Sequence, residues 1–123
     1  MKNFEDKFME IQIDMISLAL EYVQNQAEKV YIYAIADSLY SFNLFYKIKG
    51  NIVHKHLVND YLPKDSHVDI SLQSLLLKEG VKDVKSMIDI CQKYNREHPT
   101  EMWLIYDAKK NSLDSRYSYE GRY

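Results

Sequence analysis

Apolar side chains recur at every third or fourth position through the first part of the chain. Phe8, Ile11, Met15 and Leu18 are spaced by three, four and three residues, which is the period of one helix face. We therefore predict an amphipathic helix over residues 3–25. Its opposite side either faces solvent or offers a negative stripe to a basic partner. The acids of that side, at i, i+4 spacing, are Asp6, Glu10 and Asp14.

The pattern then changes to an alternation with period two. Residues 29–37 and 41–49 are rich in β-branched and aromatic side chains, and a short turn separates them. A second turn at Gly50 leads into residues 52–56. These segments predict a three-stranded antiparallel meander. Bulky side chains occupy both faces of the first strand, so we expect that strand to be central or covered on both sides.

A loop and a second helical region follow the meander. Residues 57–68 contain Pro63 among polar residues and are predicted to form a loop. From Leu72 to Tyr94 the apolar residues keep one helical phase, with Ser71 or Asp69 as a possible N-cap. Because Gly80 lies inside this pattern, we expect the helix to be kinked or broken there.

The last part of the chain is predicted to be a β-hairpin. Residues 101–107 and 113–120 form its strands, and residues 108–112 form the turn. The predicted order is α-β-β-β-α-β-β, in which meanders are separated by helices. Such an order is typical of an α+β domain whose antiparallel sheet is covered by helices. We expect one domain spanning residues 1–123.

Composition and charge narrow the class of protein further. The chain has 123 residues, a hydrophobic fraction of 46% and a net charge of −2, which disfavours a general nucleic-acid binder. Its single cysteine, Cys91, excludes an intramolecular disulfide and fits a reducing compartment. The acidic N-terminus does not resemble a signal peptide, and no apolar run approaches the length of a membrane helix. We expect a cytoplasmic protein with no membrane or nucleic-acid partner.

Few residues are arranged for chemistry. His54 and His56 have the i, i+2 spacing that places two imidazoles on one face of a strand, but a zinc site needs a third protein ligand. Cys91 falls in the apolar stripe of its predicted helix, where a thiol is usually buried and unreactive. With three glycines, the chain has no glycine-rich phosphate loop. We expect neither an enzyme nor a cofactor or metal. One alternative function is a small hydrolase or metal enzyme that uses these two histidines.

Eleven tyrosines are the most unusual feature of the composition. Tyrosine provides a large apolar area with a polar tip, and it is enriched at protein interfaces. Most of these tyrosines lie in the predicted meander and the last hairpin, which favours an interaction surface there. Aromatic residues with nearby lysines could also stack single-stranded nucleic acid, but the acidic charge balance disfavours this alternative.

Several motifs together resemble one protein family. After the long N-terminal helix comes Glu28-Lys29-Val30-Tyr31-Ile32-Tyr33-Ala34, followed by Phe45-Tyr46-Lys47-Ile48-Lys49-Gly50. The second helix ends in Tyr94-Asn95-Arg96-Glu97-His98-Pro99 before Trp103, and the closing strand ends in Tyr117-Ser118-Tyr119-Glu120. In this order the motifs resemble the YezG/EsaG-like bacterial antitoxins, also called immunity proteins. The resemblance implies a stoichiometric inhibitor of a secreted nuclease toxin, without catalytic residues of its own.

The expected function is therefore an immunity protein that neutralises a cognate toxin by occluding its active site or substrate surface. The alternative is a non-catalytic adaptor or a secretion-associated chaperone of the same fold. A nuclease site must be basic or metal-loaded, so carboxylates and tyrosines suit a partner that blocks it. We expect the free protein to be a monomer. The candidate toxin-binding residues are Tyr106, Asp107, Asp114, Tyr117, Tyr119 and Glu120, followed by Asp60, Tyr61 and Asp65.

Overall fold

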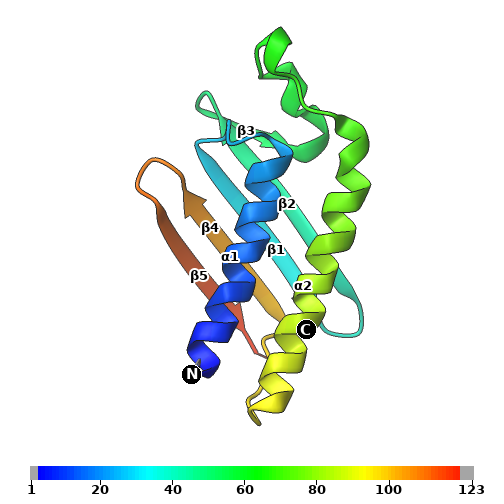
Figure 1. The fold of residues 1–123 in the computed structure, drawn as a ribbon, viewed down its shortest axis with the longest axis vertical. Helices are drawn as coiled ribbons and strands as arrows, with labels where there is room; N and C mark the ends of the chain where they lie inside the picture. The colour runs from blue at the N-terminus through cyan, green and yellow to red at the C-terminus, as the bar shows by residue number, and fades with distance from the viewer. Residues whose placement is uncertain (1–2, 120–123) are drawn as a thin grey trace.

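The computed structural model describes residues 3–119 and consists of two layers, a five-stranded sheet and a pair of helices (Figure 1). The predicted α+β class and the order of helices and strands are confirmed. In chain order the helices and strands are α1 (Phe4–Tyr22), β1 (Lys29–Ala36), β2 (Tyr40–Ile48), β3 (Asn51–His54), α2 (Gln73–Lys93), β4 (Glu101–Asp107) and β5 (Ser112–Ser118). Three short 3-10 helices separate β3 from α2, namely η1 (Lys55–Asp60), η2 (Lys64–Ser66) and η3 (Ile70–Leu72).

All neighbouring strands are antiparallel, and their order across the sheet is β3-β2-β1-β4-β5. The N-terminal meander and the C-terminal hairpin are joined by the pairing of β1 with β4, so β1 is the central strand. The prediction of a central first strand is therefore confirmed.

The turn between β2 and β3 is a tight hairpin turn of two residues. Lys49 and Gly50 both have positive φ angles, as such a turn requires.

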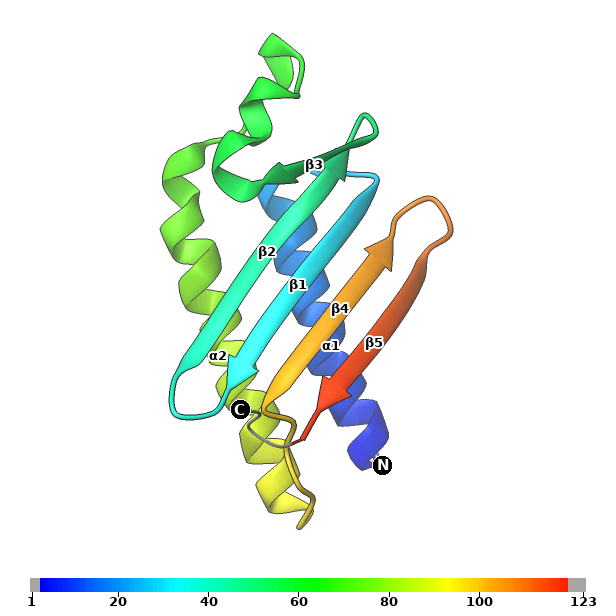
Figure 2. The same ribbon diagram turned by 180° about the vertical axis from the view of Figure 1, so that it is seen from behind.

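Both helices cover the same face of the sheet (Figures 1 and 2). The strand residues that point toward them form the core, as shown by strict alternation of buried and half-buried positions in β1. Tyr46 of β2 is completely buried, and its hydroxyl donates a hydrogen bond to the carbonyl oxygen of Ala19 in α1 at 2.7 Å. This bond fixes the N-terminal helix against the sheet, since a buried hydroxyl without a partner would be costly.

The second helix is continuous from Gln73 to Lys93, so the break that was one of the two outcomes expected at Gly80 is not found. Gly80 is buried where α2 crosses β2, and its missing side chain leaves room for the ring of Phe42. A Cβ atom at position 80 would lie 2.5 Å from Cε2 of Phe42, and closer still to Cδ2 and Cγ. Glycine therefore serves helix–sheet packing here and does not end the helix.

The segment predicted as a loop, residues 57–68, is more regular than expected, because it contains most of η1 and all of η2, and η3 follows it closely. Asn59 holds it together: its Nδ2 donates to the carbonyl oxygen of Val68 at 2.9 Å, and its Oδ1 accepts from the backbone N–H of Val68 at 2.8 Å. Asp69 caps η3 by accepting from the backbone N–H of Ser71, whereas α2 starts without a side-chain cap. Polar side chains thus satisfy the backbone groups of this segment.

Candidate functional site

The face of the sheet that points away from α1 and α2 has no covering element within residues 3–119 (Figure 2). We call this surface the open face. It is built by the strand positions that alternate with the buried ones. The open face comprises Lys29, Tyr31, Tyr33 and Ile35 of β1, Ser41, Asn43, Phe45 and Lys47 of β2, Ile52 and His54 of β3, Glu101, Trp103, Ile105 and Asp107 of β4, and Ser112, Asp114, Arg116 and Ser118 of β5.

Two pairs of stacked aromatic rings occupy the centre of the open face. Tyr31 lies directly opposite Phe45, with ring centroids 4.8 Å apart and an interplanar angle of 14°. Tyr33 lies opposite Trp103, with centroids 4.1 Å apart and an angle of 28°. The hydroxyl of Tyr33 donates a hydrogen bond to the Glu101 carboxylate, which raises the pKa of Tyr33. Cross-strand stacking fixes these side chains before any partner binds.

The two histidines extend this aromatic row toward the β3 edge. The His54 ring is 6.5 Å from that of Phe45, and the His56 ring is 5.7 Å from that of His54. The sequence predicted both histidines on one strand, but β3 ends at His54 and His56 belongs to η1. This prediction is therefore wrong. Residues 3–119 contain no group of three or more His, Cys, Asp or Glu that could hold a metal ion.

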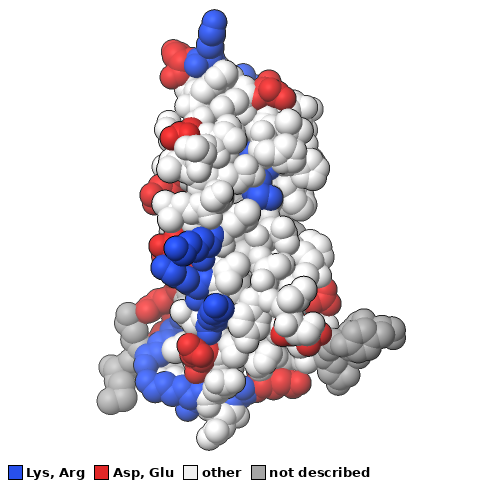
Figure 3. Space-filling model, turned by 90° about the vertical axis from the view of Figure 1, so that its right-hand side faces the viewer, with Lys and Arg blue, Asp and Glu red and all other residues white. Residues whose placement is uncertain are grey.

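The charged residues of the open face include both signs. Lys29 Nζ is 3.9 Å from Asp107 Oδ2, and Arg116 Nη2 is 3.1 Å from Asp114 Oδ2. On the flank shown in Figure 3, positive and negative side chains are likewise interspersed beside a broad uncharged area. The open face therefore combines a central aromatic cluster with a polar rim of roughly balanced charge, the anatomy of a protein interface.

The candidate acids of the last hairpin lie on the open face. Asp107 ends β4, and its Oδ1 accepts from the backbone N–H of Lys110 at 3.1 Å. Asp114 lies in β5 opposite Ile105. Both carboxylates are placed at the β5 side of the aromatic cluster, where a partner on the open face would reach them.

The candidate tyrosines of the same hairpin point to the helix-covered side. Tyr106 donates to Asn111 Oδ1 at 2.6 Å and borders a hollow beside α1. The Tyr117 hydroxyl accepts from Nε2 of the buried Gln12 at 2.8 Å, and Ser115 Oγ donates to Gln12 Oε1 at 2.8 Å. Tyr117 thus contributes to helix–sheet packing, although its ring remains partly exposed.

The remaining candidates are not brought together with the acids of the hairpin. Tyr119 follows β5, and burial raises the pKa of its hydroxyl. Asp60 ends η1, which packs beside β2 and β3, whereas Tyr61 and Asp65 belong to the following segment with η2, which extends beyond one end of the sheet (Figure 1). Glu120 lies outside the described residues. The eight candidates that the structure describes therefore do not form one surface.

The aromatic residues at the centre of the open face were not among the predicted site residues. Tyr31, Tyr33, Phe45 and Trp103 lie in strands whose two faces are both apolar in sequence. The sequence feature that could have indicated them is this excess of aromatic residues, because a strand that is covered on one side needs apolar residues only at alternate positions. Which phase the helices would leave uncovered depends on the tertiary fold.

The thiol of Cys91 belongs to the core, as its place in the apolar stripe predicts. The side chain is buried in α2, and burial raises its pKa. A raised pKa lowers the fraction of nucleophilic thiolate at neutral pH. Cys91 therefore has the environment of a structural residue.

The structure defines the class of the protein as a two-layer α+β domain with one uncovered sheet face. No protein-family model matches the chain, and no curated protein sequence matches it. Among the described residues, no helix has the length and apolarity needed to cross a bilayer.

Proposed function

We propose that this chain is an immunity protein, which binds a cognate secreted toxin, expected to be a nuclease, and neutralises it stoichiometrically in the cytoplasm. The observation that supports this proposal is the open face, with its fixed aromatic pairs and balanced polar rim. Trp103 leaves 44% of its surface exposed at the centre of that face. Exposed tryptophan and tyrosine inside a polar rim are the typical anchors of tight protein complexes.

The dimensions of the open face suit such a complex. Strands lie about 4.8 Å apart and rise about 3.3 Å per residue, so five strands of about seven residues span roughly 20 Å by 23 Å. A standard interface buries roughly 800 Å² on each partner. The side chains that project from this area, together with those of the rim, offer a surface area of the same order as that requirement.

The ring geometry favours a protein partner over single-stranded nucleic acid. Bases stack on exposed ring faces, but Tyr31 and Phe45 stack against each other, as do Tyr33 and Trp103. The mutual stacking covers one face of each ring and so reduces the ring area on which a base could stack. In addition, Lys29 is close to Asp107, so its charge is partly neutralised. A phosphate backbone would find little net positive charge here.

The proposal can be tested by isolating the partner and weakening the open face. Tagged protein from the native cell is used to capture a one-to-one partner, whose toxicity and nuclease activity are then measured with and without this chain. We expect Trp103→Ala to weaken the complex at least about 30-fold, the effect of losing a 2 kcal/mol anchor. Leu39→Ala, which truncates an exposed leucine between β1 and β2, is the matched control and leaves binding unchanged.

Three outcomes would contradict the proposal. A captured partner that is harmless alone would indicate the adaptor or chaperone function instead. Equal affinity of the Trp103→Ala and Leu39→Ala variants for the partner would show that the contact lies outside the open face. Tight binding of single-stranded RNA that is lost in Trp103→Ala would assign the face to nucleic acid.

A further inference from the structure

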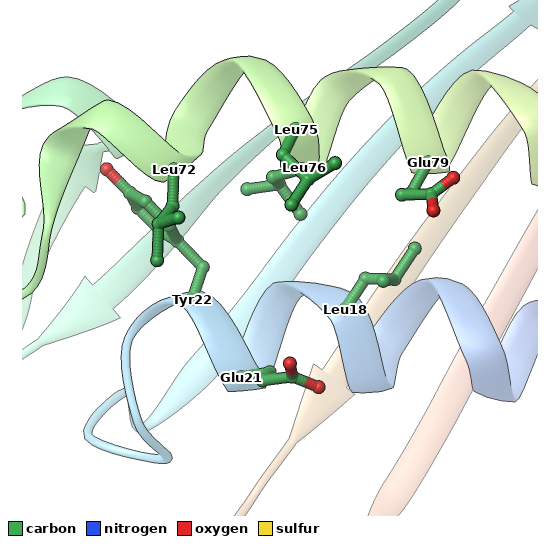
Figure 4. A pocket seen from close by; sticks show the side chains of 7 residues that line it. All are labelled: Leu18, Glu21, Tyr22, Leu72, Leu75, Leu76 and Glu79. Atoms are coloured by element: carbon green, nitrogen blue, oxygen red, sulfur yellow. The ribbon is translucent and has the colours of Figure 1, made fainter.

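A second exposed apolar area lies on the helix layer, on the opposite side of the molecule from the open face. Where the end of α1 meets the beginning of α2, the two helices leave a hollow of about 230 Å³ (Figure 4). We call it the helix groove. It is lined by Leu18, Glu21 and Tyr22 of α1, and by Leu72, Leu75, Leu76 and Glu79 of η3 and α2.

The leucines of the helix groove divide into a buried floor and an exposed edge. Leu76 is buried, whereas Leu72 and Leu75 leave 47% and 55% of their surfaces exposed. These two leucines are one helical turn apart at the start of α2. Neighbouring exposed leucines beside a hollow form a continuous apolar patch, which a single scattered leucine does not.

Carboxylates border the helix groove on both helices. Glu21 lies in the last turn of α1, which contains no basic residue, so its negative charge is close to the negative end of the helix dipole. Among residues 3–119, the Glu21 side chain has no ion-pair or hydrogen-bond partner. Glu79 on the other helix has one exposed partner, Lys82, with Nζ 3.1 Å from Oε2. A cation from outside would compensate the unfavourable position of Glu21.

The same seam between α1 and α2 remains acidic farther along. Glu10 and Asp14 of α1 and Asp83 and Asp89 of α2 border a second, more open hollow, together with Lys7. Asp83 Oδ2 is buried and has no hydrogen-bond partner among the described residues. The apolar end and the acidic end of the seam therefore lie in line between the two helices.

We propose that the helix groove binds a basic amphipathic segment of a partner protein. An aliphatic or aromatic side chain of the segment occupies the space between Leu18, Leu72 and Leu75, and flanking Lys or Arg side chains pair with Glu21 and Glu79. An apolar anchor alone would leave Glu21 unpaired and Glu79 with only its exposed partner Lys82, and a cation alone would leave the leucines exposed. The groove thus selects a segment that offers both features.

The experiment uses the full chain with isotope-labelled methyl groups and two synthetic peptides. One peptide is a short helix with leucines on one face and lysines on the other, and its match has glutamates in place of the lysines. At low salt we expect the lysine peptide to shift the methyl signals of Leu18, Leu72 and Leu75 most. The glutamate peptide should leave them in place.

Substitutions then separate the apolar contribution from the charge. Leu75→Ser should weaken the lysine peptide about tenfold, whereas the exposed control Leu39→Ser should not change its affinity. Glu21→Gln should weaken it about threefold at low salt and have no effect at high salt, because ions screen an exposed pair. Glu97→Gln, which changes an exposed acid outside the groove, is the control for charge.

Several results would overturn the proposal. These are equal binding of the glutamate peptide, signal shifts that map away from the groove, or no shift up to the solubility limit of the lysine peptide. Shifts of the same methyl signals on concentrating the protein alone would show that a second copy occupies the groove. None of these results depends on what the open face binds, so the two proposals succeed or fail separately.

Discussion

Gly80→Ala is the most direct test of how α2 packs on the sheet. The buried Gly80 faces the ring of Phe42, which is itself 3% exposed in β2. The added methyl group would sit 2.5 Å from Cε2 of Phe42 and closer to two other ring atoms. Cβ atoms in folded proteins essentially never lie within 3.0 Å of such neighbours. Either the ring must therefore rotate away from its preferred position, or α2 must move away from the sheet.

The expected change in the free energy of unfolding is a balance of two terms. Overpacking a filled core costs about 1–3 kcal/mol, since buried rings cannot move without disturbing their neighbours. Contacts as short as these place the cost in the upper part of that range, at about 2–3 kcal/mol. Replacing glycine by alanine inside a helix returns about 1 kcal/mol through helix propensity. We expect a net loss of about 1–2 kcal/mol. For a domain of this size, that loss lowers Tm by roughly 4–8 °C.

The assay is urea denaturation of Gly80→Ala, Phe42→Leu and the double variant. The smaller leucine side chain makes room for the methyl group, so the double variant should be more stable than the two single losses predict. Ser74→Ala, at an exposed position of α2, is the control for helix propensity and should raise stability slightly. A Gly80→Ala protein as stable as the unchanged chain would refute the reasoning, because the propensity gain would then act without a clash.

Two further predictions concern buried polar groups. Burial and the neighbouring Asp14 carboxyl raise the pKa of Asp83 to about 8, so between about pH 4 and pH 8 the folded protein keeps a proton that the unfolded chain has lost. Raising the pH through this range therefore lowers the stability of the unchanged protein. Asp83→Asn should gain stability relative to it at pH 9 in urea denaturation. Because the Asp83 side chain is only half-buried, solvent screening limits this gain to about 1–3 kcal/mol, and a difference independent of pH would contradict the prediction. Tyr46→Phe removes the hydroxyl that donates to Ala19, so we expect a loss of about 1–1.5 kcal/mol by thermal denaturation; an unchanged Tm would show that the bond contributes nothing.

Local patterns predicted most elements of the fold because each pattern has its own period. The strand over residues 101–107 was predicted with the bounds that β4 has, and the turn at Gly50 joins β2 to β3 as expected. Errors arose at the ends of elements. The first helix ends at Tyr22 and β3 ends at His54, because chain reversals and the 3-10 segment begin there.

The candidate site was harder to predict because it depends on which side of each strand is covered. Side chains alternate between the two sides of a strand, so Tyr117 and Asp114 of β5 must lie on opposite sides, but the alternation does not tell which of them faces the helices. The helix-covered side includes Tyr117, which hydrogen-bonds Gln12, and the open face includes Asp114. The aromatic pairs of the open face join β1 to β2 and to β4, and the latter strand is distant in sequence. Their stacking follows from strand order and register.

Local patterns in the sequence predict the α+β class, the order of the elements and the residues that share a face, because backbone periodicity is a local property. The packing of distant segments places both helices on one side of the sheet and leaves Tyr33 and Trp103 without a covering element within residues 3–119. It also decided that Gly80 is a packing position rather than a helix break. The physical reason is that burial depends on contacts between distant segments, which no local pattern records.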